Sequence, residues 1–124
     1  MLSDGKIVAF VATKDSARAK KFYESVLGLS VVHEDDFALV FDGNGTRVRI
    51  AKVRDIVLAP YTVLGWEVMD IGQEAKTLTL RGVTFERYDF LEQDPVGIWT
   101  APGGARVAWF KDPDGNVLSI SQHV

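Results

Sequence analysis

Cysteine is absent from this sequence of 124 residues. Its absence excludes disulfide bonds, thiolate ligands for a metal ion and cysteine nucleophiles. No apolar run approaches the roughly 20 residues that a membrane-spanning helix needs, so we expect no membrane partner and a cytoplasmic location. Basic residues form no cluster and the net charge is -3. Nucleic acid is therefore a poor candidate partner, because binding it requires a basic surface.

The composition that remains is that of an ordinary globular domain. Hydrophobic residues make up 47% of the chain and charged residues 25%, which argues against disorder. The length suits one domain with one core. We therefore expect a compact fold that buries most of its apolar side chains.

The first half of the chain has the pattern of a strand, a helix and three strands. Residues 7–13 are apolar and β-prone, Asp15 is a candidate N-cap, and Gly28 stands where a left-handed C-cap belongs. The helix stripe comprises Ala19, Phe22, Tyr23, Val26 and Leu27. The strand-like segments that follow are 29–33, 37–41 and 47–52, with a strong turn signal at residues 42–45.

The same order returns in the second half. Residues 63–68 read as a strand, Asp70 as an N-cap and Gly82 as a C-cap. The intervening helix stripe is Ile71, Ala75 and Leu78. Three strand-like pieces follow: 83–88, 97–100, and 106–110, which continues after a turn at residues 112–116 into 117–121.

This repeated order predicts two modules, at about residues 5–53 and 61–122, within one domain spanning residues 1–124. The two capping aspartates, Asp15 and Asp70, lie 55 positions apart. The link at residues 53–60 is too short for a flexible interdomain linker. The predicted fold class is α+β, with paired βαβββ modules.

Two motifs resemble the vicinal oxygen chelate superfamily, which includes glyoxalase I, bleomycin resistance proteins, fosfomycin resistance enzymes and extradiol dioxygenases. The first motif is Asp15, Ala19, Phe22-Tyr23 and residues 27–29, and the second is residues 110–118. The resemblance covers essentially the whole chain. It implies curved mixed sheets that enclose a cavity, and a homodimer. It also implies a divalent metal, held by histidine, glutamate or glutamine at fixed strand positions.

This sequence departs from the superfamily at those metal positions. Carried over one by one, they fall on Val8, Arg49, Val63 and Ser119. None of these side chains is a normal ligand for a divalent metal, and a cationic Arg49 would repel one. The only histidines, His33 and His123, lie elsewhere. We therefore expect no metal and no other cofactor.

The empty ligand positions mark the face of each strand that the resemblance assigns to the cavity, because strand side chains alternate between faces. That face is predicted to carry Phe10, Arg49, Tyr61, Glu67 and Ser119 as ligand-binding residues. Arg49 is a candidate to bind a carboxylate through its planar fork. Glu67 is the one candidate base. The alternative for both is a solvated position at an open rim, where Glu67 only balances Arg49.

Three tryptophans and several polar residues have alternative interpretations. Trp99 lies between two loop signals and is a candidate to close over a ligand, or to pack or contact a partner chain. Trp66 has the helix-facing parity of a core residue, and for Trp109 a core position is favoured. Ser119 and Ser121 have no histidine or aspartate to pair with, and His33 lies in an acidic turn.

Two functions remain open from the sequence. The first is a metal-independent binding protein for a small organic molecule, including an anionic one, as in bleomycin resistance proteins. The second is an enzyme of the same superfamily, a lyase or dioxygenase, that uses either a metal or acid-base chemistry by Arg49 and Glu67. The metal-dependent form is disfavoured by the ligand positions.

Overall fold

The computed structural model describes all 124 residues and divides into two compact units, Met1–Val57 and Leu58–Val124. The boundary falls inside the predicted link at residues 53–60. Each unit contains one four-stranded mixed sheet with a helix that follows its first strand. The α+β fold of two βαβββ modules is therefore confirmed, whereas their union in a single domain stays a prediction.

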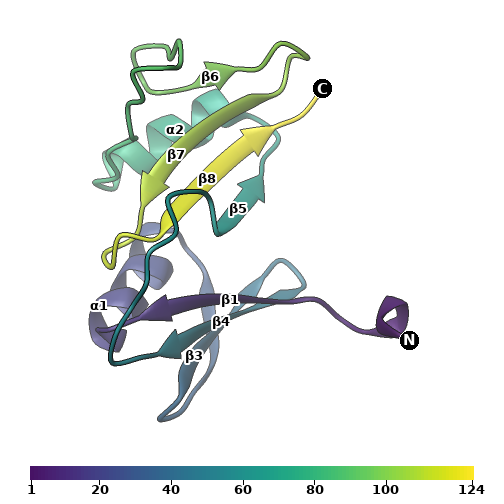
Figure 1. Ribbon diagram of the computed structural model, residues 1–124, viewed down its shortest axis with the longest axis vertical. Helices are drawn as coiled ribbons and strands as arrows, with labels where there is room; N and C mark the ends of the chain where they lie inside the picture. The colour runs from purple at the N-terminus through teal and green to yellow at the C-terminus, as the bar shows by residue number, and fades with distance from the viewer. The chain divides into compact units, whose positions relative to one another are not determined.

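In unit 1 the strand order of the sheet is β1-β4-β3-β2. Strand β1 pairs with β4 in parallel, and the other pairs are antiparallel. The short N-terminal turn η1 extends away from this sheet (Figure 1). The elements are η1 (Leu2–Asp4), β1 (Val8–Thr13), α1 (Ser16–Lys21), η2 (Phe22–Val26), β2 (Ser30–Glu34), β3 (Ala38–Gly43) and β4 (Thr46–Lys52).

The helical segment of unit 1 begins and ends where its capping residues predict. The Asp15 side chain accepts a hydrogen bond from the Arg18 N–H at 3.2 Å, which satisfies a free donor of the first turn. The helix α1 continues into the π-helical turn η2, and Gly28 then reverses the chain at φ +76°. Ala19 and Tyr23 are fully buried, and the Tyr23 ring lies 5.7 Å from that of Phe41 on β3. This contact fastens the helix to one face of the sheet.

The β3–β4 hairpin also follows its sequence signal. Asn44 and Gly45 form its two-residue loop, and both have positive φ, at 54° and 96°. Two positive φ values are the signature of the tight hairpin turn that matches strand twist. The hairpin sets the register in which Arg49 lies opposite Val40.

In unit 2 the strand order of the sheet is β5-β8-β7-β6, with β5 parallel to β8 and the other pairs antiparallel. This order repeats that of unit 1, so the predicted repeat is present in the backbone. The helix α2 lies on one face of the sheet (Figure 1). The elements are β5 (Leu64–Glu67), α2 (Ile71–Leu80), β6 (Trp99–Thr100), β7 (Arg106–Lys111) and β8 (Val117–Gln122).

The core of unit 2 lies between α2 and the sheet. The Asp70 side chain caps the helix through the Gln73 N–H, and Gly82 follows the helix with φ +97°. The predicted stripe of Ile71, Ala75 and Leu78 is buried. It faces the side of the sheet that carries Ala108, Phe110, Leu118 and Ile120, all of which are buried.

The prediction of a strand at residues 83–88 was wrong. Val83 and Phe85 are buried and Thr84 is exposed, which imitates strand alternation, but the segment joins no ladder. The Glu86 N–H makes a single backbone bond to β7, at 2.8 Å to the Trp109 carbonyl. Further backbone groups of the segment bond to the side chain of Gln93. The Gln93 amide accepts from the Tyr88 N–H at 2.7 Å and donates to the Glu86 carbonyl at 2.8 Å.

None of the helices in either unit is long and apolar enough to cross a membrane.

Candidate functional site

The open face of the unit 1 sheet, opposite the helix, brings Phe10 and Arg49 together. They are Cα partners across β1 and β4, so both side chains leave the same face, as strand alternation predicted. Val40 of β3 completes this row. Phe10 is 63% exposed, which is high for a large aromatic ring. The structure thus places an apolar side chain and a cation next to each other on a surface open to a partner.

Arg49 keeps its guanidinium available. Its side chain is partly buried, and it forms no hydrogen bond or ion pair in unit 1. A guanidinium carries five N–H donors in a rigid fork that matches the oxygens of a carboxylate. The position can therefore bind an anionic group without first breaking an internal contact. Its role in ligand binding stays a prediction.

The open face of the unit 2 sheet is shaped by Gly65 and Ser119. These residues are Cα partners across β5 and β8, and Trp109 of β7 lies on the other side of Ser119. A Cβ atom added at Gly65 would lie only 2.7 Å from Ser119 Oγ. The missing side chain at Gly65 therefore leaves room for the Ser119 hydroxyl on this face.

Trp109 was expected in the core, and that prediction was wrong. Its cross-strand partner Ser119 points to the open face, so the Trp109 side chain also lies on the side of the sheet opposite α2. Trp109 is only partly buried there. Its ring is 6.0 Å from that of Trp99 and 5.5 Å from that of Tyr88, the latter in an edge-to-face arrangement. Phe90 extends the series at 5.6 Å from Tyr88. We call Trp99, Trp109, Tyr88 and Phe90 the aromatic row.

The aromatic row combines apolar surface with one polar group. Burial raises the pKa of the Tyr88 phenol, and the nearby Glu86 carboxylate adds to the rise. Tyr88 therefore stays neutral at physiological pH and can donate a hydrogen bond. The Trp66 ring, by contrast, shares the helix-facing side with its partner Ile120, as its parity predicted.

The remaining candidates of unit 2 lie near the ends of β5 and β8. Glu67 is exposed, pairs in register with Ser121 and has no hydrogen bond in unit 2. Tyr61 was assigned to the open face of a strand, but β5 begins only at Leu64 and Tyr61 is 67% exposed in the preceding segment. Glu67 thus lacks the dry, hydrogen-bonded environment that a catalytic base needs.

Sequence reasoning missed two features of this face. Ser121 Oγ lies 3.1 Å from His123 Nε2, so the expectation that no histidine pairs with it was wrong. The position of Trp109 was readable from the turn at residues 112–116, because that hairpin pairs Lys111 with Val117 and hence Trp109 with Ser119. Tyr88 and Phe90 gave no such signal, since they lie outside regular structure.

The four positions that correspond to superfamily metal ligands do not fit a divalent metal. Val8 and Val63 offer no donor atom, Arg49 is cationic and Ser119 has only a neutral hydroxyl. In neither unit do three histidine, aspartate or glutamate side chains gather closely enough to hold an ion. His33 instead pairs with Asp35 at 3.0 Å in an exposed turn.

The sequence matches the family model described as Glyoxalase/Bleomycin resistance protein/Dioxygenase superfamily over residues 6–120. The chain belongs to this superfamily. Its motifs at residues 15–29 and 110–118 were therefore correctly interpreted. No curated protein gives a sequence match to this superfamily member.

Solved structures share the fold of this superfamily member along its whole length. A superfamily member from Sphaerobacter thermophilus has 25% identity and a TM-score of 0.77, covering 99% of this chain and 100% of its own. TnmS3, an antibiotic binding protein from Streptomyces, has 21% identity, coverage of 100% and 99%, and a TM-score of 0.72. Lactoylglutathione lyase from Agrobacterium tumefaciens has 14% identity, coverage of 96% and 93%, and a TM-score of 0.73.

Proposed function

We propose that this protein binds a small organic molecule with a planar unsaturated part, and that it does so without a metal ion. The aromatic row carries the proposal. Trp99, Trp109 and Tyr88 present ring surface on the open face of the unit 2 sheet, where a flat ligand can stack on them. Each aromatic pair contributes about 0.5–1.5 kcal/mol beyond simple burial.

Polar groups near this surface give the ligand its orientation. The Tyr88 phenol and the Ser119 hydroxyl are the neutral hydrogen-bonding groups beside the aromatic row. Within unit 1, Arg49 beside Phe10 is the proposed contact for an anionic group. Apolar surface with a few placed polar groups is the usual composition of a ligand site. Among proteins of this fold TnmS3 is an antibiotic binding protein, which supports binding as a use of the fold.

An enzymatic function has less support. One structural relative is a lactoylglutathione lyase, but at 14% identity the likeness concerns the fold alone. The proposed base Glu67 is exposed and has no hydrogen bond in its unit. Binding is therefore the function that the described side chains favour.

The test begins with an unbiased ligand screen by thermal shift, because a ligand of the native state must raise the melting temperature. Any ligand found is then titrated against tryptophan fluorescence in Trp99→Phe, Trp109→Phe and the control Trp66→Phe. We expect the fluorescence change to fall in the first two variants and to persist in the third, since Trp66 faces the helix. Full retention in both open-face variants would refute the proposal.

Metal independence has its own test. Elemental analysis of protein purified without chelator should give far less than one transition metal ion per chain. The expectation follows from Val8, Arg49, Val63 and Ser119 at the ligand positions. One ion per chain, lost together with ligand binding on dialysis against chelator, would show that the proposal is wrong.

A further inference from the structure

A second surface lies on the helix side of unit 2, where residues 83–98 run beside α2. Side-chain hydrogen bonds hold this irregular segment in place. Gln93 Nε2 donates to the Gly97 carbonyl at 2.9 Å as well as to Glu86, so one side chain joins both arms of the segment. Arg87 adds bonds from its guanidinium to the Asp94 and Gln93 carbonyls. The segment is therefore preorganised rather than a loose loop.

Gly97 brings the two arms into close contact. A Cβ atom there would lie 2.9 Å from Phe85 Cβ, and the residue has φ +118°, which side chains rarely adopt. Asp94 Oδ1 accepts from the N–H groups of Val96, Gly97 and Ile98 at 2.9–3.0 Å. Since these backbone donors are occupied, an added peptide strand would find few unpaired groups to bond with.

Between this segment and α2 lies a groove of about 700 Å³, within the range of roughly 300–1,000 Å³ usual for ligand sites. Val83 and Phe85 form its buried apolar floor, at 7% and 6% exposure. Leu80 and Val96 stand on its rim, at 89% and 39% exposure. None of Trp99, Trp109, Ser119 and Glu67 lines it, so it is distinct from the open-face site.

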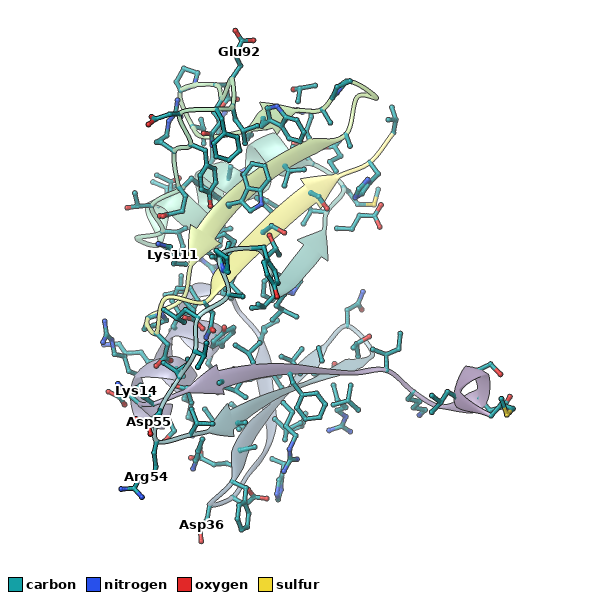
Figure 2. All side chains as sticks on the ribbon, viewed as in Figure 1. Lys14, Asp36, Arg54, Asp55, Glu92 and Lys111 are labelled. Carbon is teal, nitrogen blue, oxygen red and sulfur yellow. The ribbon has the colours of Figure 1, made fainter.

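The charged side chains of the groove are all cationic. Lys76 and Arg87 line it, and no acidic residue does. Lys76 has no ion pair, and the guanidinium of Arg87 bonds only to neutral carbonyls. Of the nearby acids, Glu86 pairs with Lys111 at 3.4 Å, and Glu92 points outward from the unit (Figure 2). Glu92 and Asp94 line a neighbouring pocket together with Arg87, and the Asp94 carboxylate accepts from three backbone N–H groups. Lys76, which has no ion pair, thus places a positive charge beside the apolar floor, and Arg87 adds a second cation.

We propose that this groove binds an amphiphile with one aliphatic chain and one anionic headgroup, such as a long-chain carboxylate. The chain would cover Val83, Phe85 and the exposed Leu80, removing apolar surface from water. The carboxylate would lie at Lys76 and Arg87, which offer charge-assisted hydrogen bonds. The proposal is independent of the function assigned to the open face.

The test uses dodecanoate, dodecanol and dodecyltrimethylammonium, each below its micelle concentration, titrated calorimetrically into the purified protein. We expect dodecanoate to bind about one molecule per chain, and the neutral and cationic analogues to bind at least about tenfold more weakly. Equal affinity for all three probes, or no binding of dodecanoate, would overturn the proposal.

Two variants locate the bound probe. Leu80→Glu should weaken dodecanoate binding at least about tenfold, because it replaces an apolar side chain of the rim with a carboxylate that repels the carboxylate of the probe. Leu2→Glu, at the 95% exposed residue of η1, is the matched control and should bind as the wild type does. Lys76→Gln should weaken dodecanoate but leave dodecanol unchanged. Binding unaffected by Leu80→Glu would show that the probe binds elsewhere.

The same variants distinguish a bound amphiphile from a second copy of the chain as the occupant of the groove. If dodecanoate fails to bind while Leu80→Glu lowers the sedimentation mass, the groove is a contact between copies of the chain and the proposal is wrong. Dodecanoate binding should also be unchanged in Trp109→Phe, because that ring lies on the opposite side of the sheet. Loss in that variant would assign the amphiphile to the aromatic row and contradict the proposal.

Discussion

Arg49 is a cation beside an apolar side chain, since it pairs with Phe10 on an open sheet face and has no hydrogen bond or ion pair within unit 1. We predict that Arg49→Ala weakens an anionic ligand found by the screen about tenfold or more, as loss of a charge-assisted contact requires. The free energy of unfolding should change much less, because no ion pair or hydrogen bond within the unit is lost.

Calorimetric titration of the wild type and the variant measures this difference. Arg54→Ala is the control, because that exposed arginine points away from the unit 1 sheet (Figure 2). Equal affinities for Arg49→Ala and the wild type would contradict the assigned role.

Asp35 provides a prediction about pH. The Phe37 N–H, then the His33 side chain and the Ala38 N–H, bind its carboxylate and lower its pKa from 3.8 to about 2. A carboxyl with a depressed folded-state pKa stabilises the fold above its unfolded value and loses that contribution as pH falls. The contribution should therefore disappear between about pH 3.8 and pH 2.

An NMR titration of the Asp35 carboxyl carbon should have its midpoint near pH 2. Asp35→Asn keeps an oxygen acceptor for the two N–H groups but removes the titration. The acid dependence of unfolding should then be shallower in the variant over this interval. A midpoint near 3.8 in the wild type would disprove the carboxylate contacts.

At the scale of elements, the β7–β8 turn gives the clearest prediction. Asp112 Oδ1 accepts from the Asp114 and Asn116 N–H groups, and Gly115 closes the turn at φ +94°. A Cβ at Gly115 would lie 2.9 Å from Leu58 Cδ1. Gly115→Ala should therefore destabilise the protein by about 1–3 kcal/mol, the range for a side chain forced into a left-handed conformation.

Denaturant unfolding of Gly115→Ala and Gly103→Ala measures this cost. Gly103 is the matched control, because its backbone does not have a positive φ and a Cβ there meets nothing within 4 Å. Similar stabilities for the two variants would count against the turn geometry.

Elements fixed by local chemistry were predictable from the sequence. Asp15, Asp70 and Gly28 fix helix ends through bonds and dihedral angles within a few residues. Residues 83–88 were not predictable, because alternating burial looks the same whether the backbone bonds to a strand or to the Gln93 side chain. The latter depends on a residue that no local pattern connects to them.

In the candidate site, too, residues in regular strands were predictable and residues outside them were not. Strand parity correctly placed Phe10 opposite Arg49, since both lie in regular ladders. It failed for Tyr61, because the alternation was extended to a residue that precedes the predicted strand at residues 63–68 and lies outside β5. The aromatic row could not be predicted as a unit, since Tyr88 and Phe90 join it from an irregular segment.

For the whole molecule we predict a homodimer. The superfamily supports the expectation, and so do the exposed apolar side chains of unit 1, among them Ile7 at 79% and Phe10 at 63%. Sedimentation equilibrium at micromolar concentration should give twice the 13.7 kDa of one chain. A mass near 13.7 kDa would refute the dimer.

The matching strand order of the two sheets has a consequence for how such a protein diversifies. Arg49 lies opposite Phe10, and Phe10 is five residues before the capping Asp15. Ser119 lies opposite Gly65, and Gly65 is five residues before the capping Asp70. The equivalent position of the two modules thus holds a cation in one half and a small hydroxyl group in the other. Because the two halves carry different side chains at this position, each half can change its recognition chemistry while the other keeps its own. Exchanging the side chains of these equivalent positions, by Arg49→Ser or Ser119→Arg, would therefore alter the recognition chemistry of one half alone.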